Sequence, residues 1–188
     1  CNDPIIFYYD NFLNREKCEY IINNFQVNLA PSLVQGEDGP KQIEGRTGKS
    51  GWIKHNEIPG LIEDISSIVG LDPHTAENFH FVKYEHGDKF KKHYDGWRHD
   101  NSKKSQTLLK NGQRIVTAIL YLNDIAQSGS THFTKLNINV FPKTGRLLVF
   151  HNTYKDSLIL HENSEHTGTE VQNGVKYIIN VWFRKLDI

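Results

Sequence analysis

From Phe79 onward, the sequence is a series of short strand-like runs separated by turn residues. The runs are rich in β-branched and aromatic residues, which favour strands. We expect strands at residues 79–84, 89–94, 114–122, 131–133, 138–141, 146–150, 157–161, 166–171 and 175–184. Because helical periodicity disappears in this part of the chain, the pattern predicts a sandwich, barrel or jelly roll and argues against alternating β-α-β units.

The N-terminal part shows a different pattern, in which two amphipathic helices are expected. Residues 5–12 predict a strand, and Asn14 is a suitable cap for the helix that follows. The apolar stripe of this helix consists of Cys18, Ile21, Ile22 and Phe25. A second helix is expected over residues 56–69, with Pro59 in its first turn and Gly70 at its end.

Residues 35–51 are polar and rich in glycine, which predicts a mobile loop or lid beside a site. Within them, Gly45–Ser50 is similar to the end of a phosphate-binding loop. The Walker A spacing, however, requires glycine at position 43, where the chain has Ile43. The sequence therefore does not predict a nucleotide site here.

The composition excludes several classes of protein. The 22 basic and 22 acidic residues balance and the pI is about 7.3, so we expect neither a nucleic-acid partner nor general attraction to a membrane surface. No apolar run is long enough to span a membrane. Two cysteines are too few for a disulfide framework or a cysteine-rich zinc site. The chain lacks Met and begins at Cys1, which predicts a processed or shortened N-terminus.

His93 and Asp95 end the second predicted strand of the series. Side chains two residues apart on a strand point to the same side, so this imidazole and this carboxylate project together. With a second histidine they would form the 2-His-1-carboxylate triad of non-haem Fe(II) oxygenases. The pair alone is a weak signal, because His55 and Glu57 repeat the spacing, and His93 could equally be an ordinary strand-end histidine.

Two downstream histidines, His161 and His166, are candidates for the third ligand. Further on, strand alternation over residues 176–184 places Lys176 and Trp182 on one face of a mostly apolar strand. An unpaired ammonium is costly in a core, so this face predicts a lined cavity; the alternative is a solvent-exposed edge.

These residues and several others occur in an order that can be compared with known families. The ordered elements are Arg46-Thr47, Tyr84, His93-x-Asp95, Arg114, Ser128–Thr131, Pro142-Lys143-x-Gly145, His166-x-Gly168, Lys176 and Trp182. Their order and spacing resemble those of the prolyl 4-hydroxylases, which are Fe(II)- and 2-oxoglutarate-dependent dioxygenases, in particular the small microbial, algal or viral type. The resemblance covers nearly the whole chain.

The resemblance implies a mainly β fold with N-terminal helices, namely a double-stranded β-helix of the jelly-roll or cupin-like class. It implies a single domain over residues 1–188, with a helical support region at 1–75 and a catalytic core at 76–188. The family's distal ligand precedes its lysine by ten residues, which selects His166 over His161.

The same resemblance implies roles for individual residues. The catalytic metal ligands would be His93, Asp95 and His166. The residues that bind 2-oxoglutarate would be Lys176, Tyr84 and Thr131. The residues beside the peptide substrate would be Arg114 and Trp182, although Arg114 could instead be a surface charge and Trp182 core filling.

The cofactors implied are Fe(II), 2-oxoglutarate as cosubstrate, O2 and ascorbate. The implied reaction converts proline in a peptide or protein to 4-hydroxyproline and releases succinate and CO2. Lys176 favours the collagen-type branch. That branch would act in the lumen of the endoplasmic reticulum, whereas a microbial enzyme would be cytoplasmic.

Two other functions fit part of the sequence. One is a non-catalytic jelly-roll module that binds peptide or glycan. The other is a zinc hydrolase with the same three ligands and a metal-bound water, which would leave Lys176 and Thr131 without a role.

Overall fold

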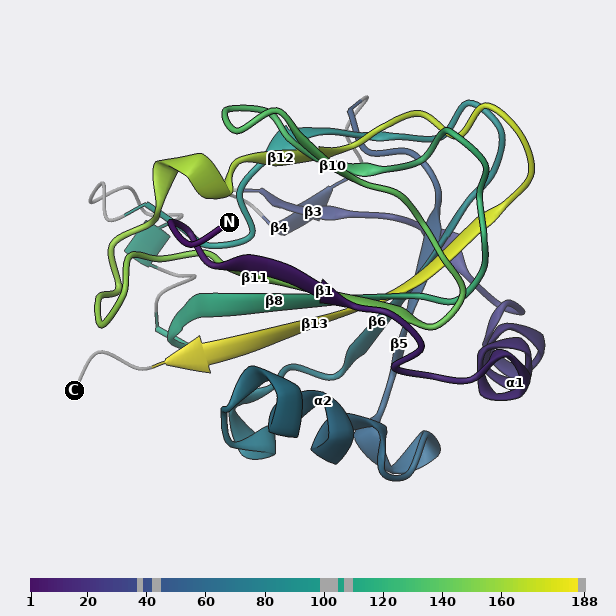
Figure 1. The fold of residues 1–188 in the computed structure, drawn as a ribbon, viewed down its shortest axis with the longest axis horizontal. Helices are drawn as coiled ribbons and strands as arrows, with labels where there is room; N and C mark the ends of the chain where they lie inside the picture. Colours follow the sequence, from purple (N-terminus) through teal and green to yellow (C-terminus); the bar gives the residue numbers. More distant parts are fainter. Residues whose placement is uncertain (37–38, 42–44, 99–104, 107–109, 186–188) are drawn as a thin grey trace.

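Two antiparallel β-sheets and two helices form three layers in the structure (Figure 1), a computed structural model that describes residues 1–36, 39–41, 45–98, 105–106 and 110–185. The larger sheet contains, in spatial order, β1 (Ile6–Tyr9), β11 (Arg146–His151), β8 (Gln113–Tyr121), β13 (Lys176–Lys185), β6 (Phe79–Tyr84), β5 (Lys49–Ile53) and β2 (Ala30–Pro31). The smaller sheet contains β10 (Ile138–Val140), β9 (Thr131–Phe133), β12 (His166–Gly168) and β7 (Phe90–His93). The fold is the predicted double-stranded β-helix, mainly β with N-terminal helices.

The helices cover one face of the larger sheet, and the smaller sheet covers the other (Figure 1). Helices α1 (Arg15–Phe25) and α2 (Leu61–Val69) bury Ile21 and Ile65 against side chains such as Phe81. A second cluster between the sheets includes Tyr121 and Phe133. Burial of each large side chain contributes about 1.5–3 kcal/mol, so these two cores fix the spacing of the layers.

Most of the predicted elements are confirmed, with boundary shifts of one to three residues; the strand predicted at 5–12, for example, is β1 and ends at Tyr9. Asn14 caps α1, because its side chain accepts a hydrogen bond of 2.8 Å from the backbone N–H of Lys17. The second helix begins later than predicted. A separate turn, η1 (His55–Glu57), precedes it, and Gly60 has a φ of 81°, a left-handed conformation that interrupts the helix before Leu61. Pro59 therefore lies outside the helix.

The strand predicted at 157–161 is wrong. Instead, Leu160 makes only an isolated bridge with Thr153. The chain turns back there, with Asp156 at a φ of 54°, and the turn ends in η3 (Glu162–Ser164). The next predicted strand is also too long, because β12 ends at Gly168. The run of apolar residues alone did not distinguish this turn from a strand.

The predicted loop at 35–51 needs correction, because part of it is a strand. Lys49–Ile53 forms β5, which pairs with β6, and β1 pairs with β11, so the N-terminal part extends the larger sheet. Within the predicted loop, β3 (Val34–Gly36) and β4 (Gly39–Lys41) form a hairpin. Residues 37–38 and 42–44 of that loop lie outside the described part of the chain.

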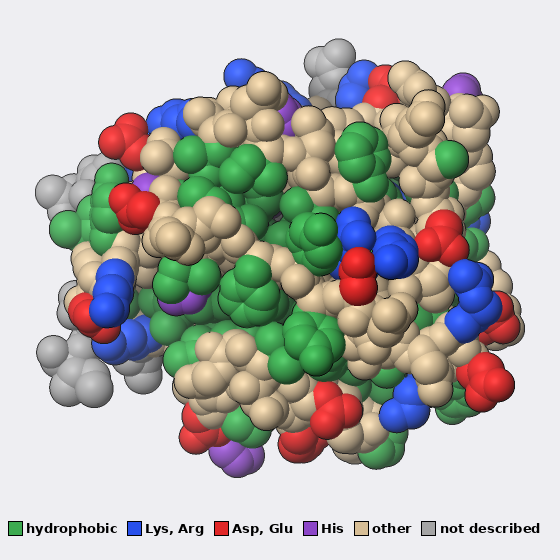
Figure 2. All heavy atoms as spheres, viewed as in Figure 1, with side chains coloured by type: hydrophobic (Ala, Val, Ile, Leu, Met, Phe, Trp, Pro, Cys, Tyr) green, Lys and Arg blue, Asp and Glu red, His purple; other side chains and the backbone are tan. Residues whose placement is uncertain are grey.

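Aromatic side chains are exposed along β1. Phe7, Tyr8 and Tyr9 are all exposed, and Figure 2 shows hydrophobic side chains gathered across the middle of the face on which β1 lies. Among the helices that the structure describes, none is long and apolar enough to cross a membrane. A short helix, η2 (Pro73–Thr75), leads from α2 to β6 and completes the elements.

Candidate metal centre

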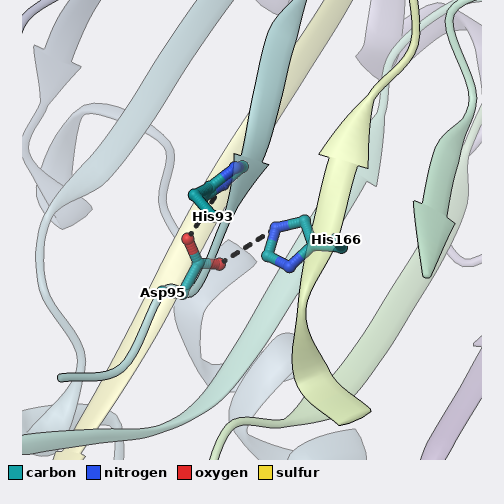
Figure 3. A group of neighbouring side chains, drawn as sticks. All are labelled: His93, Asp95 and His166. Carbon is teal, nitrogen blue, oxygen red and sulfur yellow. Dashed lines mark ion pairs between the residues drawn. The ribbon is translucent and has the colours of Figure 1, made fainter. Parts of the chain in front are cut away.

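His93, Asp95 and His166 meet at the edge of the smaller sheet (Figure 3). His93 is the last residue of β7, and Asp95 follows it by two residues. His166 is the first residue of β12 and lies directly opposite His93 in the antiparallel register. Cross-strand neighbours have adjacent side chains, so strand pairing brings together two histidines that are far apart in sequence.

The three side chains converge on one point. His93 Nε2 lies 3.5 Å from Asp95 Oδ1, and His166 Nε2 lies 3.8 Å from Asp95 Oδ2. The potential ligand atoms all lie within 4.8 Å of one another. This spacing suits atoms that surround a common ion, and two imidazoles with one carboxylate are the donor set of a ferrous oxygenase centre.

Hydrogen bonds to the backbone turn both imidazoles toward that point. His93 Nδ1 lies 2.8 Å from the carbonyl oxygen of Lys91, and His166 Nδ1 lies 3.0 Å from that of Ser164. A carbonyl oxygen can only accept, so Nδ1 carries the hydrogen in each ring. The lone pair of Nε2 is therefore available to a metal in both histidines.

A buried hydrogen-bond chain holds the carboxylate. Thr117 Oγ1 donates to Asp95 Oδ2 at 2.9 Å and accepts a hydrogen bond, also of 2.9 Å, from Asn152 Nδ2. Thr117 and Asn152 are completely buried. Sequence analysis missed both residues, and the only signal was a polar side chain within, or at the end of, an apolar strand.

The protonation states favour metal binding. Burial, together with His93, lowers the pKa of His166 to about 4. Burial opposes the ionisation of Asp95, but His166 and His93 beside it bring the pKa of this carboxyl well below its usual range. Near neutral pH, His166 is a neutral imidazole and Asp95 a carboxylate, which are the forms that bind a divalent cation.

Lys176 is a buried cation on the opposite sheet. It begins β13, pairs in register with Tyr84 and is only 3% exposed. Its Nζ donates to the carbonyl oxygen of Gly129 at 2.6 Å, and among the described residues no carboxylate lies within 4.0 Å of it. Burial lowers the pKa of Lys176 to about 7. An ammonium buried without a counter-ion indicates a site for an anion.

Tyr84 and Thr131 lie in the same pocket as Lys176. The Nζ of Lys176 is 5.4 Å from the centre of the Tyr84 ring, and burial raises the pKa of Tyr84 to about 12, so this phenol keeps its proton. Thr131 Oγ1 lies 2.6 Å from the hydroxyl of Tyr121. Sequence analysis missed Tyr121, which stands in an apolar strand and resembles an ordinary core residue.

Arg114 and Trp182 also line this pocket, and they contact each other. The guanidinium of Arg114 lies 3.8 Å from the centre of the Trp182 ring and forms two hydrogen bonds with Glu77, of 2.5 and 2.7 Å. Arg114 is therefore held in place, unlike a free surface charge. Trp182 is 6% exposed, so most of its ring is packed.

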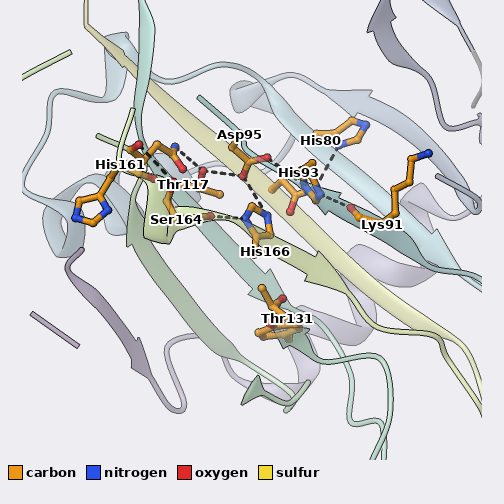
Figure 4. A network of polar contacts seen from close by, with 12 residues as sticks. His80, Lys91, His93, Asp95, Thr117, Thr131, His161, Ser164 and His166 are labelled. Atoms are coloured by element: carbon orange, nitrogen blue, oxygen red, sulfur yellow. Dashed lines mark hydrogen bonds and ion pairs between the residues drawn. The ribbon is translucent and has the colours of Figure 1, made fainter. Parts of the chain in front are cut away.

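His161 lies apart from the ligand group and points away from it (Figure 4). Its Nε2 lies 2.9 Å from Asp3 Oδ1, and its Nδ1 accepts a hydrogen bond from the backbone N–H of Asn163. Another histidine, His80, was missed by sequence analysis. It lines the pocket with its ring 5.4 Å from that of Trp182, and burial lowers its pKa well below the usual value.

All predicted site residues line one pocket of about 910 Å³ between the two sheets. The ligand group lies on the smaller sheet, and Lys176 lies on the larger one. A pocket of this size, with a divalent-metal donor set and a separate buried cation, fits a metal ion together with a dicarboxylate.

Comparison with known proteins shows the family. The model of the 2OG-Fe(II) oxygenase superfamily matches residues 79–184. A protein of Acanthamoeba polyphaga mimivirus named "Putative prolyl 4-hydroxylase" is 32% identical over 187 residues, which cover 98% of this chain and 75% of the relative. The chain belongs to the 2OG-Fe(II) oxygenase superfamily, in its prolyl 4-hydroxylase-like family.

Other relatives agree with this assignment. Prolyl 4-hydroxylase 2 of Arabidopsis thaliana is 29% identical, over 95% of this chain and 67% of the relative. The fold matches viral collagen prolyl hydroxylase from Paramecium bursaria Chlorella virus-1, solved with 2OG, with a TM-score of 0.74 and 23% identity over 100% of this chain and 99% of the other. As a member of this family, the protein is a 2-oxoglutarate-dependent dioxygenase that uses Fe(II), so the predicted enzyme class is confirmed.

Proposed function

We propose that this protein hydroxylates prolyl residues of a peptide or protein at C4 and converts 2-oxoglutarate to succinate and CO2. The observation that carries the proposal is the position of the His93, Asp95 and His166 group in the same pocket as the unpaired, buried ammonium of Lys176. The named relatives are prolyl 4-hydroxylases, which supports proline as the target.

His93 Nε2, His166 Nε2 and one oxygen of Asp95 would hold the ferrous ion. When bound, the ion supplies the O2 activation that oxidises both 2-oxoglutarate and the substrate. The protein's own task is to keep these three ligands in one orientation. Backbone carbonyls fix the two imidazoles, and Thr117 fixes the carboxylate.

Lys176 would pair with the distal carboxylate of 2-oxoglutarate, with Thr131 and Tyr84 as hydroxyl partners. A charge-assisted hydrogen bond in a buried pocket is stronger than a neutral one and sets the position of the whole molecule. The reactive end of the cosubstrate is then directed toward the ligand group on the opposite sheet.

The substrate side of the pocket is rich in aromatic rings. Its aromatic lining includes Trp52, Tyr94, Trp97 and Trp182. Trp52 is 59% exposed, which leaves a large indole face open to a ligand. Aromatic grooves bind proline-rich segments well, because the extended polyproline conformation is ordered before binding and loses little entropy. We propose that Arg114 and Trp182 contact this segment.

Two further parts of the proposal concern the reductant and the domain. Ascorbate would keep the metal in its ferrous form.

Strands near both ends of the chain, β1 and β13, belong to the same sheet, which supports residues 1–188 acting as one catalytic unit.

The test is an incubation with Fe(II), ascorbate, 2-oxoglutarate and a proline-rich peptide. We expect succinate and a peptide mass gain of one oxygen atom, about 16 Da. The Asp95→Ala variant is the control and should give neither product. Peptide binding without turnover would instead indicate a binding module, and activity with zinc alone would indicate a hydrolase.

A further inference from the structure

Positive charge is concentrated in the active-site pocket of a chain that has no net charge. The whole chain has 22 basic and 22 acidic residues. The lysines and arginines that line the pocket are Arg46, Lys91, Lys92, Arg98, Arg114, Lys176 and Arg184. Asp95 is the one acidic residue among the described lining residues. Because the chain as a whole is not basic, this excess of positive charge is a property of the pocket.

Three of these cations already have partners or assigned roles. Lys176 is assigned to the distal carboxylate of 2-oxoglutarate. Arg114 and Arg184 both bind the single carboxylate of Glu77, with Arg184 Nε at 2.8 Å from Glu77 Oε1. One carboxylate for two guanidiniums leaves a net positive charge beside Trp97, whose ring contacts both arginines.

The other four cations form a cationic rim, which we define as Arg46, Lys91, Lys92 and Arg98. Within the described ranges, no carboxylate lies within 4.0 Å of any of them. In contrast, several lysines elsewhere have such partners, for example Lys89 with Glu170 and Lys143 with Asp10. The rim thus forms no ion pair within the described ranges, although Glu165 interacts with Lys92, and Asp95 with Arg46, at longer range.

The rim is also held close to the ligand group by the backbone. Lys91 and Lys92 belong to β7, the strand that ends at His93. Both are exposed, and strand alternation places Lys91 on the same face as His93 and Lys92 on the other. The Lys91 side chain extends away from the metal ligands (Figure 4). A Cβ added at Gly45 would lie 2.0 Å from Lys91 Cδ, so the lysine stem packs closely on this glycine.

Aromatic rings position the two arginines of the rim. The guanidinium of Arg46 lies 4.7 Å from the centre of the Phe90 ring and donates to the carbonyl oxygen of Leu33. Its Nε is buried without a partner among the described residues. The guanidinium of Arg98 lies 5.5 Å from the Tyr94 ring. Within the described part of the chain, Arg46 donates only through Nη1 and the Arg98 side chain forms no hydrogen bond, so both guanidiniums keep N–H groups for a ligand.

We infer that the substrate is an acidic peptide, in which Asp or Glu side chains flank the proline that is hydroxylated. This inference rests on the proposed function, because it concerns the peptide that enters the same pocket. The bound cofactors would not neutralise the rim, because the charges of a divalent metal, Asp95, Lys176 and a dicarboxylate together sum to zero. Facing charges of opposite sign raise the association rate and select among partners.

The test compares three fluorescent peptides with the same proline-containing centre and acidic, neutral (Gln) or basic (Lys) flanks. Binding is measured by anisotropy in the absence of metal and 2-oxoglutarate, and hydroxylation is measured by mass. We expect the acidic peptide to bind about 10-fold more tightly than the neutral one, and this advantage to shrink as salt is raised. Equal binding of the three peptides would overturn the inference.

A charge-reversal variant tests the assigned residues. Lys91→Glu should lower the affinity for the acidic peptide several-fold, raise that for the basic peptide and leave the neutral peptide nearly unchanged. The matched control is Lys17→Glu, an exposed lysine on α1 outside the pocket, which should change none of the three. If both variants have the same effect, the cationic rim does not recognise the charge of the peptide.

The two levels of the proposal fail in different ways. If the neutral peptide is hydroxylated and the flanking charges have no effect, the inference is wrong and the proposed function stands. If no proline-containing peptide is hydroxylated under any condition, the proposed function itself is wrong.

Discussion

Thr117 donates a hydrogen bond of 2.9 Å to Asp95. Thr117 lies on β8 of the larger sheet, whereas Asp95 follows β7 of the smaller sheet. The contact therefore links the larger sheet to the metal ligands that the smaller sheet carries. Asn152 fixes the direction of this bond, because its amide donates to Thr117 and leaves the threonine hydrogen to point at the carboxylate.

Thr117→Val keeps the shape of the side chain and removes the donor. We expect metal affinity to fall about 10- to 100-fold, which is the usual effect of losing a hydrogen bond to a metal ligand. Thr117→Ser keeps the hydroxyl and should remain close to wild type. Isothermal titration with Fe(II) under anaerobic conditions measures the change, and an unchanged affinity in the valine variant would show that Asp95 needs no such support.

Lys176→Ala removes the buried ammonium. The KM for 2-oxoglutarate should rise by at least about 100-fold, because the carboxylate loses a charge-assisted hydrogen bond in a buried site. The affinity for iron should change little, since no metal ligand touches Lys176. Steady-state kinetics and metal titration on the same preparation separate the two effects, and an equal loss of both would contradict the assigned role.

The affinity for 2-oxoglutarate should depend on pH through Lys176. Burial lowers the pKa of Lys176 from its usual 10.5 to about 7, so the group is charged below pH 7 and neutral above it. Binding of the dianion should be strong near pH 6 and weaken up to about 10-fold per unit as the pH rises above 7. Lys176→Arg keeps its charge at every pH and should abolish this dependence if it still binds the cosubstrate.

The lowered pKa of Lys176 also affects the stability of the fold, which should change with pH in the opposite direction to the affinity for 2-oxoglutarate. Between pH 7 and 10.5 the unfolded chain holds a proton on Lys176 that the folded chain has lost. Stability contributed by this group therefore rises with pH across that window in the absence of ligand. Urea denaturation of wild type and Lys176→Met at several pH values measures it.

Gly145→Ala should destabilise the fold. Gly145 has a φ of 72°, and an added Cβ would lie 1.8 Å from the backbone oxygen of Leu13, so the turn before β11 would have to move away from the segment that leads into α1. We expect the free energy of unfolding to fall by about 2 kcal/mol or more. Gly87→Ala is the control, because Gly87 has a φ of 86° but open space around it, and it should lose only about 1 kcal/mol.

The sequence predicted the strands of the core well, because β-branched and aromatic runs such as 79–84 and 114–122 are confined by turn residues. It also predicted the ligand candidates His93 and Asp95, which are two residues apart in sequence, although β7 ends at His93 and Asp95 follows it. The choice of His166 required a resemblance to a family, because nothing local distinguishes it from His161.

What sequence reasoning missed depends on contacts between distant segments. Thr117 and Asn152 are polar residues in apolar surroundings, and only the packed structure shows that Thr117 donates to Asp95 and that Asn152 donates to Thr117. The strand β5 was missed because its Gly-rich, polar sequence gains order from pairing with β6. The error at 157–161 has the reverse cause, because apolar residues that favour a strand lie in a turn, where Ile159 is 65% exposed.

The central claim is that His93, Asp95 and His166 bind one ferrous ion. An anaerobic Fe(II) titration of the wild type, His166→Ala and His161→Ala tests it most directly. We predict one ion per chain in the wild type and in His161→Ala, and no binding of comparable affinity in His166→Ala. Loss of the ion in His161→Ala with full binding in His166→Ala would contradict the account.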